Sequence, residues 1–173
     1  MNTEKNYMKI TDRFISTWLL IIFLVLSILV FISTWQAKRN LPPYVGKQLS
    51  EIEMAEVIKR NSPLTSYVHL SPNADFSRKS KIKKITIHHM GANLTLKHLG
   101  ESFGKKDRKA SSNYAIDNEG NVALYVEEAH RSWASSKKEN DDMAITIEVA
   151  NKTIGDDWGI SNEAYETLIN LCT

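Results

Sequence analysis

The sequence predicts an α/β domain with a mixed central sheet flanked by helices, preceded by a single transmembrane helix. Three observations lead to this prediction. An uncharged apolar run occupies the N-terminal part of the chain, short alternating segments rich in β-branched residues occupy the rest, and amphipathic stretches separate these segments. Strands that are interrupted by helices along the chain are typical of a sheet covered by helices.

The composition is that of a folded chain. Its 173 residues are 24% charged and 42% hydrophobic, and this length allows one ordinary domain and little more. The net charge is +2, so the chain as a whole shows no footprint for binding nucleic acid. The single cysteine, Cys172, excludes an internal disulfide and any zinc site of the CxxC type.

The apolar run FISTWLLIIFLVLSILVFISTW, residues 14–35, contains no charged residue. A helix of this length crosses a bilayer core of about 30 Å. Trp18 and Trp35 lie near its ends, where their rings favour the membrane interface. The run is longer than the apolar region of a cleavable signal peptide, so we expect an uncleaved anchor after a short tail, residues 1–13. Basic residues lie on both sides of the run, so charge does not set its orientation.

A linker and a short amphipathic helix are expected in residues 36–65. Two prolines and a glycine interrupt regular structure in QAKRNLPPYVGKQ. The next segment, LSEIEMAEVIKRN, has apolar residues at helical spacing, and Ser50 is a suitable N-cap. A helix that packs on the domain and a stalk that lies on the membrane are both compatible with this pattern; we favour the first.

The predicted domain comprises residues 66–173. We expect strands in YVHL, KIKKITIHH and MAITIEVAN, and a hairpin in SNYAIDNEGNVALYVEE. One helix is expected after Thr95 and another after Ser161, because each residue can cap the helix that follows. The last helix should bury an apolar face that includes Tyr165 and Cys172.

His88 and His89 follow a strand in which Ile85 and Ile87 are expected to be buried. Adjacent strand residues point to opposite faces, so at most one of the two histidines faces a given site. The ends of strands in α/β sheets are where sites form, although a lone histidine at such a position is more often structural. Zinc catalysis generally needs three protein ligands, and the chain has no HExxH motif.

Glu148 is a carboxylate among the apolar residues of AITIEVAN. Carboxylates are rarely fully buried unless they are paired. Glu148 is therefore either an exposed residue of an edge strand or a general base in a cleft. Tyr114, in SSNYAID, either lines the same cleft or fills the core.

Three segments in succession resemble the zinc-dependent type 2 N-acetylmuramoyl-L-alanine amidases, the family of phage endolysins and bacterial autolysins to which peptidoglycan recognition proteins are related. They are ITIHHM, ASSNYAIDNEGNVALYVEEAHRSWASS and NDDMAITIEVAN, in the order and spacing of the family, and the resemblance spans residues 67–173. It implies hydrolysis of the peptidoglycan amide between the lactyl group of N-acetylmuramic acid and L-alanine, by a water molecule that zinc activates.

The resemblance implies roles for individual residues. His88 matches a zinc ligand, whereas His89 matches a variable position. Glu148 matches the catalytic glutamate that takes a proton from the attacking water. Tyr114 matches a tyrosine of the cleft that would donate a hydrogen bond to the oxyanion. The residues that match substrate-binding positions are Arg131, Trp133 and Asn140.

Departures from the family pattern limit these assignments. Ala134 replaces a histidine that commonly follows the tryptophan. His130 matches a surface position, and His69 and His98 have no counterpart, so we expect all three to be solvated. The family's other two zinc ligands lie beyond the helix that ends this sequence, and Cys172 does not match them, so we expect a buried structural thiol there.

The sequence therefore predicts one zinc ligand of three in a domain that is truncated at its C-terminus. One alternative to a hydrolase is an inactive, membrane-anchored module that binds peptidoglycan. Another is a structural remnant without a ligand. For the first two functions the domain should face the cell wall from the cell membrane, because peptidoglycan lies there.

Overall fold

The computed structural model divides into two units, Met1–Leu41 and Pro42–Thr173, which are described separately. The backbone is described for residues 2–39, 41–155 and 157–173. Side chains are described for residues 15–35, 41–155 and 157–173, so Phe14, the expected start of the apolar span, lies outside them.

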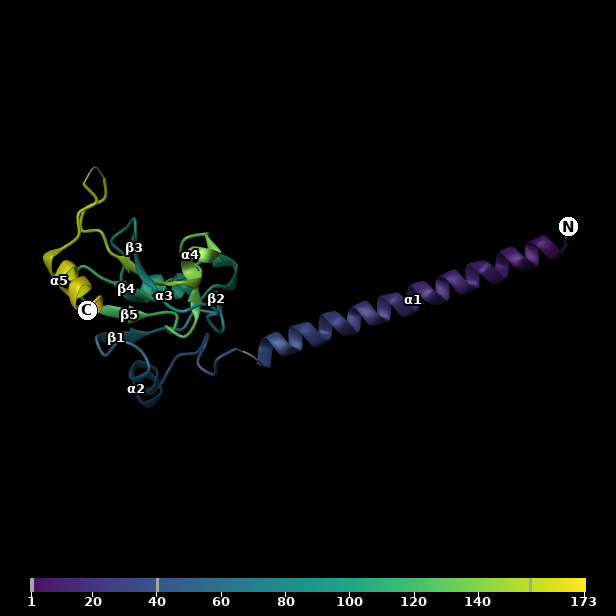
Figure 1. Ribbon diagram of the computed structural model, residues 1–173, viewed down its shortest axis with the longest axis horizontal. Helices are drawn as coiled ribbons and strands as arrows, with labels where there is room; N and C mark the ends of the chain where they lie inside the picture. Colours follow the sequence, from purple (N-terminus) through teal and green to yellow (C-terminus); the bar gives the residue numbers. More distant parts are fainter. Residues whose placement is uncertain (1, 40, 156) are drawn as a thin grey trace. The chain divides into compact units, whose positions relative to one another are not determined.

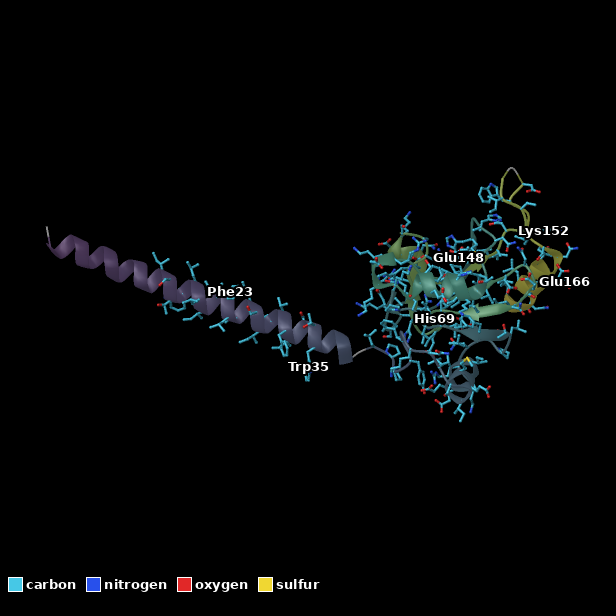
Figure 2. The ribbon with its side chains drawn as sticks, turned by 180° about the vertical axis from the view of Figure 1, so that it is seen from behind. Phe23, Trp35, His69, Glu148, Lys152 and Glu166 are labelled. Atoms are coloured by element: carbon cyan, nitrogen blue, oxygen red, sulfur yellow. The ribbon has the colours of Figure 1, made fainter. Side chains whose placement is uncertain are left out.

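The first unit is the helix α1 (Asn2–Arg39). Its segment Ile15–Trp35 is long and apolar enough to cross a membrane, and it is the one such helix in the described part of the chain. Phe23 and Trp35 project from this helix in Figure 2, and their side chains are exposed. A membrane anchor and a signal sequence near the N-terminus share these properties.

The second unit is built on a five-stranded sheet with the order β1-β5-β4-β7-β3. Four of these strands, β1, β3, β4 and β5, are labelled in Figure 1. The hairpin partners β4 and β5 are antiparallel, and the other neighbouring pairs are parallel. This confirms the predicted mixed sheet. The strands are β1 (Thr65–Val68), β3 (Lys84–His89), β4 (Tyr114–Ile116), β5 (Val122–Leu124) and β7 (Ala144–Val149).

Three predicted helices cover the two faces of this sheet. The helices α2 (Glu51–Lys59) and α5 (Asn162–Leu171) pack with Tyr114, Ile116 and Ile147 on one face. The helix α3 (Leu96–Phe103) packs on the other face with Ala115, Ala123 and Tyr125, because side chains alternate along a strand. The predicted N-caps are confirmed: Ser50, Thr95 and Ser161 each accept a hydrogen bond from the backbone of the helix that follows.

Short elements complete the second unit. A two-stranded antiparallel ribbon pairs β2 (Ala74–Asp75) with β6 (Arg131–Ser132). A 3₁₀ helix, η1 (Lys106–Arg108), follows α3, and a one-turn helix, α4 (Lys138–Asp142), precedes β7. None of these four elements was predicted, because segments of two to five residues carry too little periodicity to be recognised.

Two expectations about burial are wrong. Ile85 and Ile87 are 41% and 53% exposed, because β3 is an edge strand and their side of it is not covered. On α5 the buried residues are Ala164 and Leu168, while Tyr165 is 55% exposed. Cys172 at the end of this helix is also exposed rather than buried.

Candidate functional site

His88 and Glu148 lie side by side near the carboxyl ends of β3 and β7. The two strands are parallel, and His88 is the register partner of Glu148. Register partners on adjacent strands, about 4.8 Å apart, point to the same face of a sheet. This face is the one that α3 covers, because Ala115 is the partner of Glu148 on the next strand. The structure thus brings together the two residues to which the sequence attributed chemistry.

His88 has a ring nitrogen without a partner. Its Nε2 atom is buried and has no hydrogen-bond partner among the described residues. Buried polar atoms are almost always hydrogen-bonded in native proteins. A buried imidazole nitrogen in this state suits a metal ion or a polar group of a substrate as its partner.

The carboxyl group of Glu148 has a pKa near neutral pH. Burial raises the pKa of Glu148 to about 7, although the positive charge of Arg108 acts in the opposite direction. A carboxyl group with this pKa is present in both protonation states at pH 7, which is the property a general acid and base needs. Glu148 is labelled on the sheet in Figure 2.

The described residues do not form a zinc site by themselves. A catalytic zinc ion takes three protein ligands and keeps a fourth position for water. No group of three histidine, cysteine, aspartate or glutamate residues comes together in the part of the chain that the structure describes. The unpartnered Nε2 of His88 fits one ligand position, and Glu148 is the register partner of His88 on the adjacent strand. Since the set is incomplete, no chemical step can be assigned to zinc here.

The structure does not bring Tyr114 into this site. The register partner of Tyr114 is Ile147, so its side chain points to the opposite face from Glu148. It is 1% exposed, and its hydroxyl group donates a 2.7 Å hydrogen bond to Glu128 and accepts one of 2.9 Å from the backbone of Ser62. Burial, reinforced by Glu128, raises the pKa of Tyr114. The expectation that Tyr114 lines the cleft is therefore wrong.

The side chains of Arg131 and Trp133 both donate hydrogen bonds to the carboxylate of Asp75. Arg131 is 8% exposed and donates from Nε and Nη2 to one oxygen of Asp75, at 2.9 and 2.7 Å. The indole nitrogen of Trp133 donates to the other oxygen at 2.9 Å. Arg131 also lies 3.5 Å from Asp142. These contacts brace the β2–β6 ribbon and give no support to the expected substrate contact of Arg131.

Asn140 lies at the other end of the strands. Its side-chain nitrogen donates to Ser135 at 3.1 Å, and its oxygen accepts from Lys84 at 2.5 Å. Lys84 is the first residue of β3, whereas His88 is near the end of that strand. The expected substrate-binding role of Asn140 therefore does not place it beside His88.

The remaining histidines differ from one another. His98 is exposed, as expected. His69 is half-buried against Gly100 and Gly104, and the side chain of His130 is 17% exposed, so the expectation of solvated side chains is wrong for both. Burial lowers the pKa of each. The Nδ1 atom of His89 lies 3.0 Å from the side-chain nitrogen of Asn151, within hydrogen-bond distance.

The sequence analysis missed buried polar residues that hydrogen-bond to the backbone of the strands and loops near the site. The side-chain oxygen of the buried Asn113 accepts from the backbone of Thr146 at 3.1 Å, and the backbone of Asn113 donates to the Thr146 hydroxyl at 3.0 Å. Asp141, 1% exposed, accepts hydrogen bonds from the backbone of Ala134 and Ser135 at 3.1 Å each. The signal was the placement of SSN and NDD just before strands, since these residue types bond to neighbouring backbone.

A cavity of about 500 Å³ lies elsewhere, at the free edge of β1. Its lining comes from the segment Gly46–Leu49, from β1 and from Lys97 and Glu101 of α3. Neither His88 nor Glu148 contributes to it. This cavity and the pair His88 and Glu148 are therefore separate.

Comparisons with known proteins agree with the geometry. The profile of a family described as N-acetylmuramoyl-L-alanine amidase matches residues 78–173, more than half of the chain. A search of curated proteins finds no match.

Three solved structures are similar to the chain. A point mutant of PlyL aligns with a TM-score of 0.50 and 13% identity, over 61% of this chain and 69% of that one. AmpD aligns with a TM-score of 0.45 and 16% identity, over 61% and 70% of the two chains. The Drosophila peptidoglycan recognition protein SA aligns with a TM-score of 0.44 and 18% identity, over 57% and 60%. At these identities the first match shows a shared fold only.

Proposed function

Because the chain belongs to the N-acetylmuramoyl-L-alanine amidase family, we propose that it acts on peptidoglycan, at the amide between N-acetylmuramic acid and the L-alanine of the stem peptide. The observation that supports this proposal is the pairing of His88 with Glu148 at the ends of β3 and β7. An unpartnered buried imidazole next to a carboxyl group with a pKa of about 7 has few structural explanations.

Glu148 would carry the proton transfers of the hydrolysis. As a carboxylate it takes a proton from the attacking water, and as a carboxylic acid it gives that proton to the departing amine. With a pKa of about 7, each form is accessible at neutral pH without a large cost. Arg108 favours the charged form of Glu148, which is the form that can accept a proton.

His88 would supply one contact to zinc, which in this family lowers the pKa of the attacking water when it is bound. The other two ligands of such an ion would have to come from outside the described residues. We therefore propose zinc-dependent hydrolysis when those ligands are present. The described residues would supply the general base, Glu148, and one zinc ligand, His88.

Recognition of peptidoglycan without hydrolysis is the second candidate function. It is favoured by the lack of any three-residue ligand group among the described side chains. In that case Nε2 of His88 would receive a hydrogen bond from the bound wall fragment, or donate one to it, and the Glu148 carboxyl group would do the same.

One experiment separates these functions from a remnant without a ligand. The full chain in detergent is mixed with purified peptidoglycan, and the bound protein, the released stem peptides and the zinc content of the protein are measured. Release of stem peptides supports hydrolysis, and retention without release supports recognition. If the chain neither binds nor cleaves, the proposal fails.

We also propose that α1 is a single membrane anchor and that the second unit faces the wall. The apolar helix supports attachment to a membrane or secretion, and the family supports a substrate outside the cell.

A further inference from the structure

Four cations lie within five residues between α3 and β4. They are Lys105, Lys106, Arg108 and Lys109, which we call the basic turn, and Asp107 is the acidic residue among them. All of these side chains are exposed. None of the four cations takes part in an ion pair with any described side chain, whereas Arg60, Arg131 and Lys138 each do.

Buried polar side chains hold the start of the basic turn in place. Asn73, 2% exposed, donates from its side chain to the carbonyl oxygens of Phe103 and Lys105, each at 2.8 Å. Ser71, 1% exposed, donates to the same oxygen of Phe103 at 2.6 Å. Satisfied buried networks of this kind fix one conformation of the backbone they contact.

The end of the turn is fixed in the same way, beside the candidate site. The Ser111 hydroxyl donates to the carbonyl oxygen of Asn73, and the Ser111 backbone donates to Trp133 at 3.1 Å. The turn connects α3, the helix that covers the sheet face of His88 and Glu148, to β4 of the same sheet. The basic turn therefore borders that face.

We propose that the basic turn binds the phosphodiester groups of an anionic polymer carried on the cell wall, and so holds the domain on its substrate; this rests on the proposed action on peptidoglycan. Exposed cations without acidic partners attract polyanions over several ångströms of water. Lysine ammonium groups bind phosphate as point charges. Four charges within five residues suit the repeated charges of a polymer better than the few carboxylates of one stem peptide.

The test uses the full chain in detergent and two preparations of one cell wall. One keeps its phosphodiester polymers, and the other is stripped of them with cold hydrofluoric acid. The test variant carries Lys105→Gln, Lys106→Gln and Lys109→Gln. The control carries Lys59→Gln, Lys81→Gln and Lys152→Gln, three exposed lysines with no described ion pair, so the net charge changes equally. Circular dichroism checks that both variants are folded.

The unaltered chain and the control should bind intact walls about tenfold more tightly at 50 mM than at 200 mM salt, as expected for a few displaced counterions. The test variant should bind intact walls several-fold more weakly and lose most of this salt dependence. It should match the unaltered chain on stripped walls.

Two results would overturn the inference while leaving the proposed function intact. In one, the test variant binds intact walls as the control does. In the other, it is weakened equally on both walls, which would assign the basic turn to stem-peptide carboxylates. Failure of the unaltered chain to bind either wall would instead remove the proposed function, and this inference with it.

Discussion

The burial of the Glu148 carboxyl group lowers the stability of the folded state when this group is ionised. Its carboxyl group is partly buried, and its pKa of about 7 means that ionisation is disfavoured in the folded state. On its own face of the sheet the register partner of Glu148 is the fully buried Ala115, and apolar surroundings of this kind disfavour the charged form of the carboxyl group. The cost of holding the carboxylate is therefore present whenever the protein is folded above neutral pH.

The first prediction concerns stability and pH. The folded-state pKa of Glu148, about 7, lies above its ordinary value of 4.5, so the native state binds more protons than the unfolded state between these values. Stability from this group is therefore greatest below pH 4.5 and decreases as pH rises towards 7. The Glu148→Gln variant should be more stable than the unaltered chain at pH 8 by about 2 kcal/mol.

Urea unfolding of both proteins in the same detergent, at pH 5 and pH 8, measures this difference. The other titrating groups are common to both proteins and cancel. An equal stability difference at the two pH values would show that Glu148 has an ordinary pKa.

The second prediction separates the roles of the paired residues. In a chain that carries the family's remaining ligands, Glu148→Gln should lower the rate of stem-peptide release by about 100- to 10,000-fold, because it removes the general base. Its zinc content should stay unchanged. His88→Ala should lower the zinc content itself. Full activity of Glu148→Gln would mean that this carboxylate is not the base.

The third prediction concerns zinc in the 173-residue chain. The described residues bring together no group of three ligand side chains, so the purified chain should bind zinc weakly and lose it on dialysis against a mild chelator. Zinc is measured by atomic absorption before and after dialysis. One tightly retained ion per chain would show that a further set of ligands exists.

At the same scale, the sequence singled out His88 and Glu148 because both lie near the ends of strands and both match the family, whereas their side-by-side position follows from the register of β3 and β7. Tyr114 could not be placed, because the face on which a residue of a three-residue strand points depends on the register with its neighbours. Arg131 could not be placed either, because its partner Asp75 lies far away in the sequence.

Elements whose boundaries depend on local chemistry were predicted well. The helices α2, α3 and α5 begin after Ser50, Thr95 and Ser161, because a cap is made between residues three apart. The β2–β6 ribbon instead depends on long-range contacts, so local sequence does not reveal it. The exposure of β3 follows from its position at the edge of the sheet, which periodicity alone does not give.

The fourth prediction compares two helix caps. The Ser161 hydroxyl accepts from the backbone of Ala164 at 3.1 Å and donates to the carbonyl oxygen of Asn118 at 2.6 Å, and Ser161 is 7% exposed. Ser161→Ala removes both bonds and should destabilise the folded unit by about 1–2 kcal/mol. The Ser50→Ala change at an exposed cap should cost less, about 0.5–1 kcal/mol. Urea unfolding measures both, and an equal or reversed order would contradict this account.

At the scale of the whole molecule, α1 and the sheet-containing unit differ in whether their apolar side chains are exposed or buried. The apolar side chains of Ile15–Trp35 are exposed, whereas those of the second unit gather in two clusters on either side of the sheet. The uncharged run indicated an element distinct from the domain, because a stretch of about 20 mostly apolar residues without a charge is rarely left in water.

The fifth prediction concerns orientation. Charge does not set it, because Lys5, Lys9 and Arg13 precede the apolar run while Lys38 and Arg39 follow it. The proposed substrate does, because peptidoglycan lies outside the membrane. Protease added to intact protoplasts should therefore remove the second unit from a membrane-bound chain, while a cytoplasmic marker protein survives. If only permeabilised cells lose it, the unit faces the cytoplasm. If the protein instead appears in the medium without its first residues, α1 is a signal sequence, and contact with the wall after secretion would depend on the second unit alone.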